Sequence, residues 1–139
     1  MRNAFSVTIV LLTAGVFCSG CANSTAAVLE SDNQVKLRSI QSRSFETTDK
    51  EKALRTAMAT LQDLGFVIDE ADLVLGTVSA TKLSRYAMRM TVTVRAHGQR
   101  QLMVRANAQY NLKAIEDPLP YQQFFNAYSK AMFLTAQEI

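Results

Sequence analysis

The residues best suited to recognition chemistry gather in one basic stretch, which runs from position 82 to position 113. It contains seven basic residues and no acidic one: Lys82, Arg85, Arg89, Arg95, Arg100, Arg105 and Lys113. Side chains alternate between the two faces of a β-strand. Alternation therefore predicts one polar binding face that carries Arg89, Thr91, Arg95, Arg105 and Asn107.

Such a face suits an anionic ligand or the acidic surface of a partner protein. The competing interpretation is a solvated face whose arginines discourage aggregation of the sheet. Both interpretations stay open at the level of the sequence.

Residues that could support catalysis occur without the partners that catalysis needs. His97 is the single histidine, and the stretch 73–115 around it contains no Cys, Asp or Glu, so we interpret it as a turn residue. Glu70 and Asp72 form a carboxylate pair in a predicted tight turn, a setting that does not support glycosidase-like catalysis. Three serines lack a nucleophile-elbow setting: Ser79, Ser84 and Ser129. We expect no catalytic residue, no metal site and no cofactor.

The N-terminus has the pattern of an export signal. A positive start at 1–3 precedes an uncharged, mostly apolar run at 4–17, and the small residues Ser19 and Gly20 follow. The run is shorter than the roughly 20 apolar residues of a membrane-spanning helix. We therefore predict a signal peptide over residues 1–20, and an exported protein is not expected to meet nucleic acid.

The junction Cys18-Ser19-Gly20-Cys21 resembles the bacterial lipobox. The resemblance implies cleavage after Gly20 and acylation of Cys21, which would anchor the protein to a membrane. Cys18 departs from the motif, where Leu, Val or Ile is usual. The alternative is an uncleaved leader in which both cysteines are apolar residues. Ala22 after the acylated position resembles the signal for outer-membrane delivery, facing the periplasm.

The rest of the chain predicts one domain of the α+β class. Its composition, 48% hydrophobic and 19% charged, suits a single globular core. We predict a flexible tether over residues 21–35 and a single domain over 36–139. The expected order is β-α-β-β-β-β-α, a two-layer sandwich in which two helices cover one face of a mostly antiparallel sheet.

Local patterns predict the individual elements. A first strand is expected around 38–45, and a helix follows with a capping box of Thr48 and Glu51 and a stop at Gly65. A hairpin of 66–69 and 73–82 is expected to turn at 70–72.

Two alternating runs, 86–96 and 102–110, predict the central hairpin of the sheet. In an antiparallel pair, the residue numbers of paired residues have a constant sum, which we call the register sum. The apolar faces of the two strands coincide only when this sum is even, which requires a loop with an odd number of residues around His97. A sum of 196 pairs Val94 with Leu102, Val92 with Val104, Thr91 with Arg105, and Arg89 with Asn107.

A last helix is expected to begin at Pro118, with Asp117 as its cap. Its apolar stripe is interpreted as core, with a partner contact as the alternative: Phe124, Phe125, Tyr128, Met132 and Phe133.

Three further segments resemble a family of small lipoproteins of Gram-negative bacteria: 41–49, 61–69 and 121–125 with Phe133-Leu134. The resemblance implies a lipoprotein without catalytic residues, in an accessory role beside envelope transport or efflux systems. The expected function is therefore that of an outer-membrane-anchored, non-catalytic binding or assembly accessory of an envelope complex. The alternative is a carrier of an anionic lipid or glycan, held between the sheet and the helices.

Overall fold

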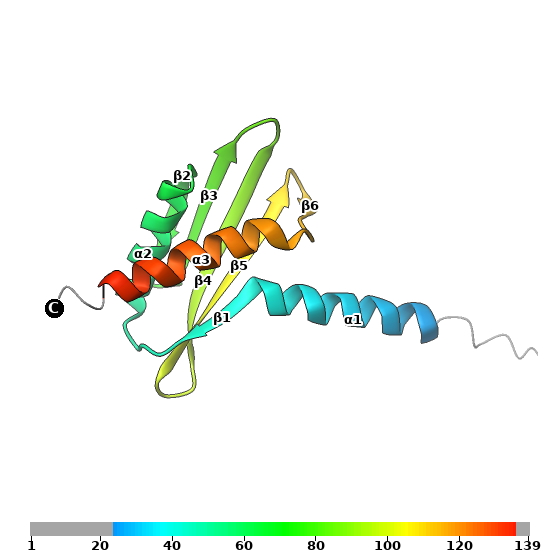
Figure 1. The fold of residues 1–139 in the computed structure, drawn as a ribbon, viewed down its shortest axis with the longest axis horizontal. Helices are drawn as coiled ribbons and strands as arrows, with labels where there is room; N and C mark the ends of the chain where they lie inside the picture. The colour runs from blue at the N-terminus through cyan, green and yellow to red at the C-terminus, as the bar shows by residue number, and fades with distance from the viewer. Residues whose placement is uncertain (1–23, 136–139) are drawn as a thin grey trace, which may run out of the picture.

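The protein folds as a helix layer against one antiparallel sheet, which confirms the predicted α+β class (Figure 1). The structure is a computed structural model that describes residues 24–135. The predicted signal peptide and Cys21 lie outside these residues. The helices are α1 (Ser24–Gln41), α2 (Lys50–Asp63) and α3 (Pro118–Thr135). The strands are β1 (Ser42–Phe45), β2 (Val67–Asp72), β3 (Thr77–Leu83), β4 (Ala87–His97), β5 (Gln101–Tyr110) and β6 (Lys113–Ala114).

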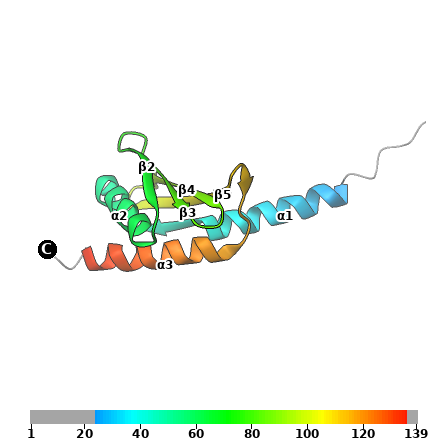
Figure 2. The ribbon, with the colours of Figure 1, turned by 90° about the horizontal axis from the view of Figure 1, so that it is seen from above.

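The strand order is β1-β5-β4-β3-β2, with every neighbouring pair antiparallel, and β6 pairs with β5 beyond the end of β1. Helices α2 and α3 lie on one face of this sheet, as predicted (Figure 2). The alternating apolar residues of β3, β4 and β5 point toward these helices and are almost fully buried, among them Val78, Val92 and Val104. The other sheet face carries the polar residues of the same strands.

Helix α1 replaces the tether and the start of the first strand that we predicted. The expected tether over 21–35 and the strand over 38–41 are wrong where α1 runs from Ser24 to Gln41, and only Ser42–Phe45 forms a strand. The physical reason is that residues 22–41 contain no Gly or Pro and include many good helix formers. Leu37 and Ile40 then pack against the core.

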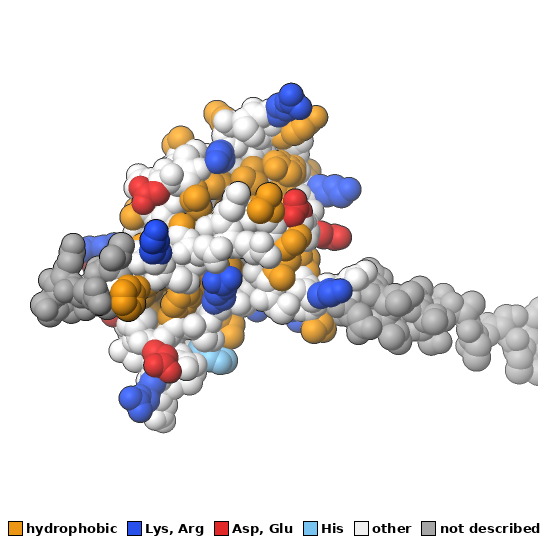
Figure 3. All heavy atoms as spheres, in the orientation of Figure 1, with side chains coloured by type: hydrophobic (Ala, Val, Ile, Leu, Met, Phe, Trp, Pro, Cys, Tyr) orange, Lys and Arg blue, Asp and Glu red, His pale blue; other side chains and the backbone are white. Residues whose placement is uncertain are grey.

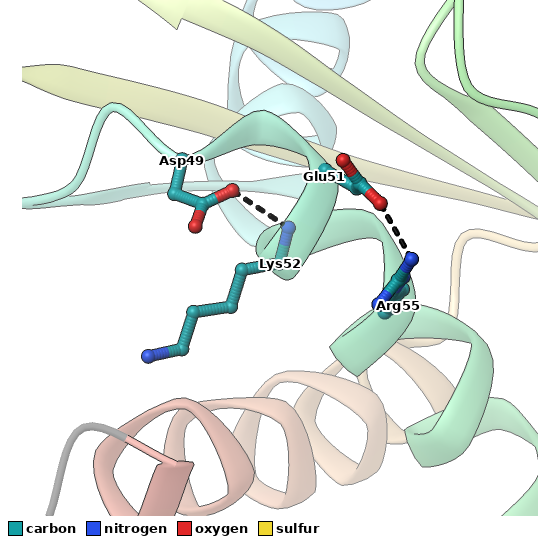
Figure 4. A network of polar contacts seen from close by, with 4 residues as sticks. All are labelled: Asp49, Glu51, Lys52 and Arg55. Atoms are coloured by element: carbon teal, nitrogen blue, oxygen red, sulfur yellow. Dashed lines mark hydrogen bonds and ion pairs between the residues drawn. The ribbon is translucent and has the colours of Figure 1, made fainter. Parts of the chain in front are cut away.

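The N-cap of helix α2 lies one residue after Thr48, the N-cap of the predicted capping box. Asp49 is the N-cap, because its carboxylate accepts a hydrogen bond from the backbone N–H of Lys52 at 2.9 Å. Glu51 pairs instead with Arg55 one turn further on (Figure 4). A carboxylate accepts the exposed amide better than a hydroxyl does, so Asp49 takes the place that we assigned to Thr48.

The hairpin of β2 and β3 is present, but its turn lies at residues 73–76 and not at 70–72. Asp72 starts this turn: its side chain accepts from the N–H of Leu75 and its carbonyl from the N–H of Gly76, both at 2.8 Å. Glu70 and Asp72 therefore belong to β2, which also contains an irregularity between Ile68 and Glu70.

The register sum of the hairpin of β4 and β5 is even, as predicted, but its value differs from the predicted 196. Its register sum is 198: Val94 pairs with Val104, Thr93 with Arg105, and Thr91 with Asn107. The reason is that Gly98 adopts a φ of +67°, which lets the chain reverse directly after His97. His97 then pairs with Gln101, and the loop between them has three residues.

Helix α3 begins as predicted, with the Asp117 carboxylate accepting from the N–H of Leu119 at 2.9 Å. Phe124, Phe125 and Tyr128 are fully buried, which confirms their core role, whereas Phe133 is 63% exposed. Burial raises the pKa of Tyr128 well above its usual range, so its hydroxyl stays protonated and donates to the carbonyl of Ala53 at 3.0 Å. Among the described residues, no helix is long and apolar enough to cross a membrane.

Candidate functional site

The candidate site is the sheet face that α2 and α3 leave uncovered. We call it the open face and define it by the residues of β2, β3, β4 and β5 that point away from these helices. The five predicted binding residues all lie on it: Arg89, Thr91, Arg95, Arg105 and Asn107. The corrected register keeps them together, because a shift of two residues in the pairing leaves every side chain on its face.

Arg89 lies between solvent and the β2 edge of the sheet. Its Nε is 3.7 Å from Oδ2 of Asp69, and the Arg89 side chain is 57% exposed. The same Asp69 oxygen accepts a hydrogen bond from Thr81 at 2.6 Å. An exposed pair of this length stabilises the fold little, so Asp69 positions Arg89 without neutralising its capacity for a partner carboxylate or phosphate.

Arg105 is positioned toward the opposite edge of the sheet. Its Nε donates to Oγ of Ser42 on β1 at 3.2 Å, which leaves the terminal nitrogens of the guanidinium for other acceptors. Thr93 donates from Oγ1 to the backbone carbonyl of Arg105 at 3.4 Å. Arg95 is exposed and lies opposite Met103 in the ladder. Arg105 is the diagonal neighbour of Arg95 on this face, because Arg95 pairs with Met103, whereas Arg89 lies six residues from Arg95 along β4.

Hydroxyl and amide side chains fill the space between these cations. Ser79 on β3 and Thr91 on β4 are hydrogen-bonded to each other at 3.2 Å, and Thr91 is paired across the ladder with Asn107 on β5. This middle row offers donors and acceptors to a ligand that lies flat on the sheet.

The open face also has an acidic edge, which was not predicted from the sequence. Glu70 is paired with Ser79, and Asp72 with Thr77, so both carboxylates share the face of the arginines. The Asp72 carboxylate also holds the turn, as described above. The open face is therefore bipolar, with acidic residues on β2, neutral residues on β3 and cations on β4 and β5. The acidic edge could not be predicted from the sequence, because the sheet face on which Glu70 lies depends on the pairing of β2 with β3. We had also expected Glu70 in a turn.

The remaining candidates do not assemble into a catalytic centre within the described part of the chain. His97 lies exposed at the end of β4, and Ser129 donates back to the carbonyl of Phe125 at 2.7 Å within α3. The hydroxyl of Ser79 is hydrogen-bonded to the hydroxyl of Thr91, which is neither a general base nor an acid. No group of three or more His, Cys, Asp or Glu residues is arranged to hold a metal ion among the described residues.

The space between the sheet and the helices is occupied by side chains. Tyr121, Phe124, Phe125 and Tyr128 are fully buried there. The ring of Phe124 contacts those of Phe125 and Tyr128, and the ring of Tyr128 also contacts Phe45. A groove of about 510 Å³ lies elsewhere, between α1 and the start of α3, and is lined by Asn33, Gln34, Lys36, Leu37, Ile40 and Glu116, among others. A carrier cavity between the two layers would require these aromatic side chains to move apart.

Comparison with known proteins does not place the chain in a family: no protein-family model matches it, and no curated protein matches it. The resemblance to small lipoproteins is therefore carried by the quoted segments alone.

Proposed function

We propose that this protein is a lipid-anchored periplasmic protein of the outer membrane that binds an envelope protein complex as a non-catalytic accessory. The observation that carries the proposal is the open face, where Arg89, Arg95 and Arg105 share one uncovered sheet surface with hydroxyl and amide groups. Because Arg89 and Arg95 are six residues apart on β4, the cations extend along the strand, which favours recognition of an extended acidic surface over capture of one small ligand.

The acidic edge on β2 makes the face selective. A partner must place acidic groups over β4 and β5 and cannot place them over Asp69, Glu70 and Asp72, where like charges repel. A plain electrostatic surface would accept any polyanion, whereas a bipolar face fixes the orientation of the partner. A folded protein surface satisfies such a pattern more readily than a uniformly anionic polymer.

The proposed anchor supplies location. Acylation of Cys21 would hold the domain at the membrane and raise its effective concentration near other envelope proteins. The support for this part is the N-terminal sequence pattern and the Cys18–Cys21 motif. Moderate affinity at the open face is then sufficient for a stable complex.

Reversal of two arginines tests the proposal. We expect the double variant Arg89→Glu, Arg105→Glu to lose recovery of the partner from mildly solubilised membranes, because two attractive contacts become repulsive. Both side chains are exposed, so the free energy of unfolding is expected to change by less than about 1 kcal/mol. Affinity purification of the full chain followed by protein and lipid identification is the measurement.

The matched control is Arg55→Glu with Lys130→Glu, which changes the net charge equally but on the helix layer, where both residues are exposed. This control is expected to retain the partner. Equal recovery by both double variants would overturn the role of the open face. A lipid or glycan recovered with the wild type in place of a protein would instead favour the carrier alternative.

A further inference from the structure

Two turns meet at the end of the sheet that is remote from His97. One joins β3 to β4 through residues 84–86, and the other joins β5 to β6 through residues 111–112. The strand register brings them together, because Leu83 pairs with Ala87, and Tyr110 pairs with both Met88 and Lys113. The β3–β4 turn extends past the helices that cover the sheet (Figure 1).

Large apolar side chains are concentrated at this end. Leu83 is 80% exposed, Tyr86 67%, Tyr110 41% and Leu112 97%. We call these four residues the sheet tip. The rings of Tyr86 and Tyr110 contact each other edge to face, with centroids 6.2 Å apart, which holds the two turns together.

The sheet tip is apolar on both faces of the sheet. Leu83 lies on the open face, because Val78 and Ala80 of the same strand alternate toward the core. Tyr110 lies on the helix side, in line with the buried Ala106 and Ala108, but beyond the cover of the helices. A flat protein partner would cover the apolar residues of one sheet face only, whereas the lipids of a bilayer can surround the sheet tip on both faces.

Cations flank the apolar residues. Arg85 lies in the β3–β4 turn and Lys113 directly follows Leu112, and both are exposed. No Asp or Glu occurs between residues 73 and 115. Basic and hydrophobic side chains lie side by side over the free ends of β3 and β4 (Figure 3). Tyrosine and leucine beside Lys and Arg are typical of protein segments that enter the headgroup region of an anionic bilayer.

We propose that the sheet tip is an interfacial membrane contact, which inserts Leu83, Tyr86 and Leu112 into an anionic bilayer while Arg85 and Lys113 bind its phosphates. This contact is separate from acylation of Cys21 and from recognition by the open face. It points the strands toward the bilayer, so that the open face stands beside the membrane, accessible to a neighbouring membrane protein.

Tryptophan fluorescence of the full chain tests this contact. The protein contains no Trp, so Leu112→Trp introduces a single reporter at the tip, and Gln99→Trp introduces one at the other end of the sheet as a control. The vesicles contain phosphatidylcholine and phosphatidylglycerol with brominated acyl chains. We expect Leu112→Trp to shift its emission to shorter wavelength and to be quenched by the bromine, and Gln99→Trp to do neither.

The cations are tested in the same assay. Adding Arg85→Gln and Lys113→Gln to Leu112→Trp is expected to lower the equilibrium constant for insertion about 25-fold, or about fivefold per cation. Quenching should also fall in pure phosphatidylcholine vesicles and at ~1 M salt, where screening is strong.

Equal quenching at the two reporter positions, or none at Leu112→Trp, would overturn the proposal. So would a tip reporter that ignores vesicles but changes its emission when an envelope protein is added, because the tip would then be a protein contact. The arginine-reversal experiment on the open face uses other residues, so failure of one proposal is distinguishable from failure of the other.

Discussion

The variant Gly76→Ala is expected to lower the free energy of unfolding by about 3 kcal/mol, which is a large part of the ~5–15 kcal/mol typical of such domains. Gly76 has a φ of +70°, a left-handed conformation that costs a non-glycine residue roughly 1–3 kcal/mol. A Cβ there would lie 2.6 Å from the backbone carbonyl oxygen of Val94 and 2.3 Å from Cε of Lys50. The carbonyl cannot move freely, because Val94 is part of β4. Urea denaturation is the measurement.

The control for this variant is Gly98→Ala. Gly98 has a similar φ of +67°, but a Cβ there meets no heavy atom within 4 Å. Its replacement should therefore cost only about 1 kcal/mol, from backbone strain alone. Equal losses of stability in the two variants would show that the close approach of Gly76 to β4 contributes nothing.

The variant Tyr121→Phe is expected to lower the free energy of unfolding by about 3 kcal/mol, because one hydroxyl serves several buried groups. Tyr121 donates to the carbonyl of Ile115 at 2.6 Å and accepts from the N–H of Ala108 at 3.2 Å and from Nε2 of Gln41 at 3.1 Å. The backbone N–H of Ala108 lies at the edge of β5, between the residues of β5 that pair with β1 and those that pair with β6. The hydroxyl thus completes an interrupted strand edge.

Thermal unfolding and amide hydrogen exchange measure this effect together. Loss of the hydroxyl should lower the Tm by about 10 °C or more and accelerate exchange of the Ala108 amide in particular. Tyr128→Phe is the matched control, because its hydroxyl reaches one carbonyl, that of Ala53, which already lies within α2. Tyr128→Phe should lower the free energy of unfolding by about 1 kcal/mol. A Tyr121→Phe variant no less stable than the control would contradict the bridging role.

Much of the fold could be predicted from alternation and helical periodicity. The pattern of β4 and β5 placed five site residues on one face, and that face survived a wrong register because a shift of two residues preserves side-chain direction. Helix α3 and its Asp117 cap were likewise predictable, since the cap and Pro118 act locally.

Other features depend on contacts between distant segments and could not be predicted in this way. The extent of α1 is supported by packing of Leu37 and Ile40 on the core, which a local window does not contain. The direction of Glu70 depends on its pairing with β3, so the acidic edge of the site became visible only in the sheet. The sheet tip required the register that brings Tyr86 to Tyr110.

The most direct test of the central claim is site-specific photo-crosslinking of the full chain in intact cells. A photoreactive residue replaces Asn107 on the open face or, as the control, Asn126 on the helix layer, and both positions are exposed. We predict a discrete adduct with one envelope protein from position 107 and none from position 126. Adducts from position 126 alone, or no protein adduct from position 107, would contradict the account.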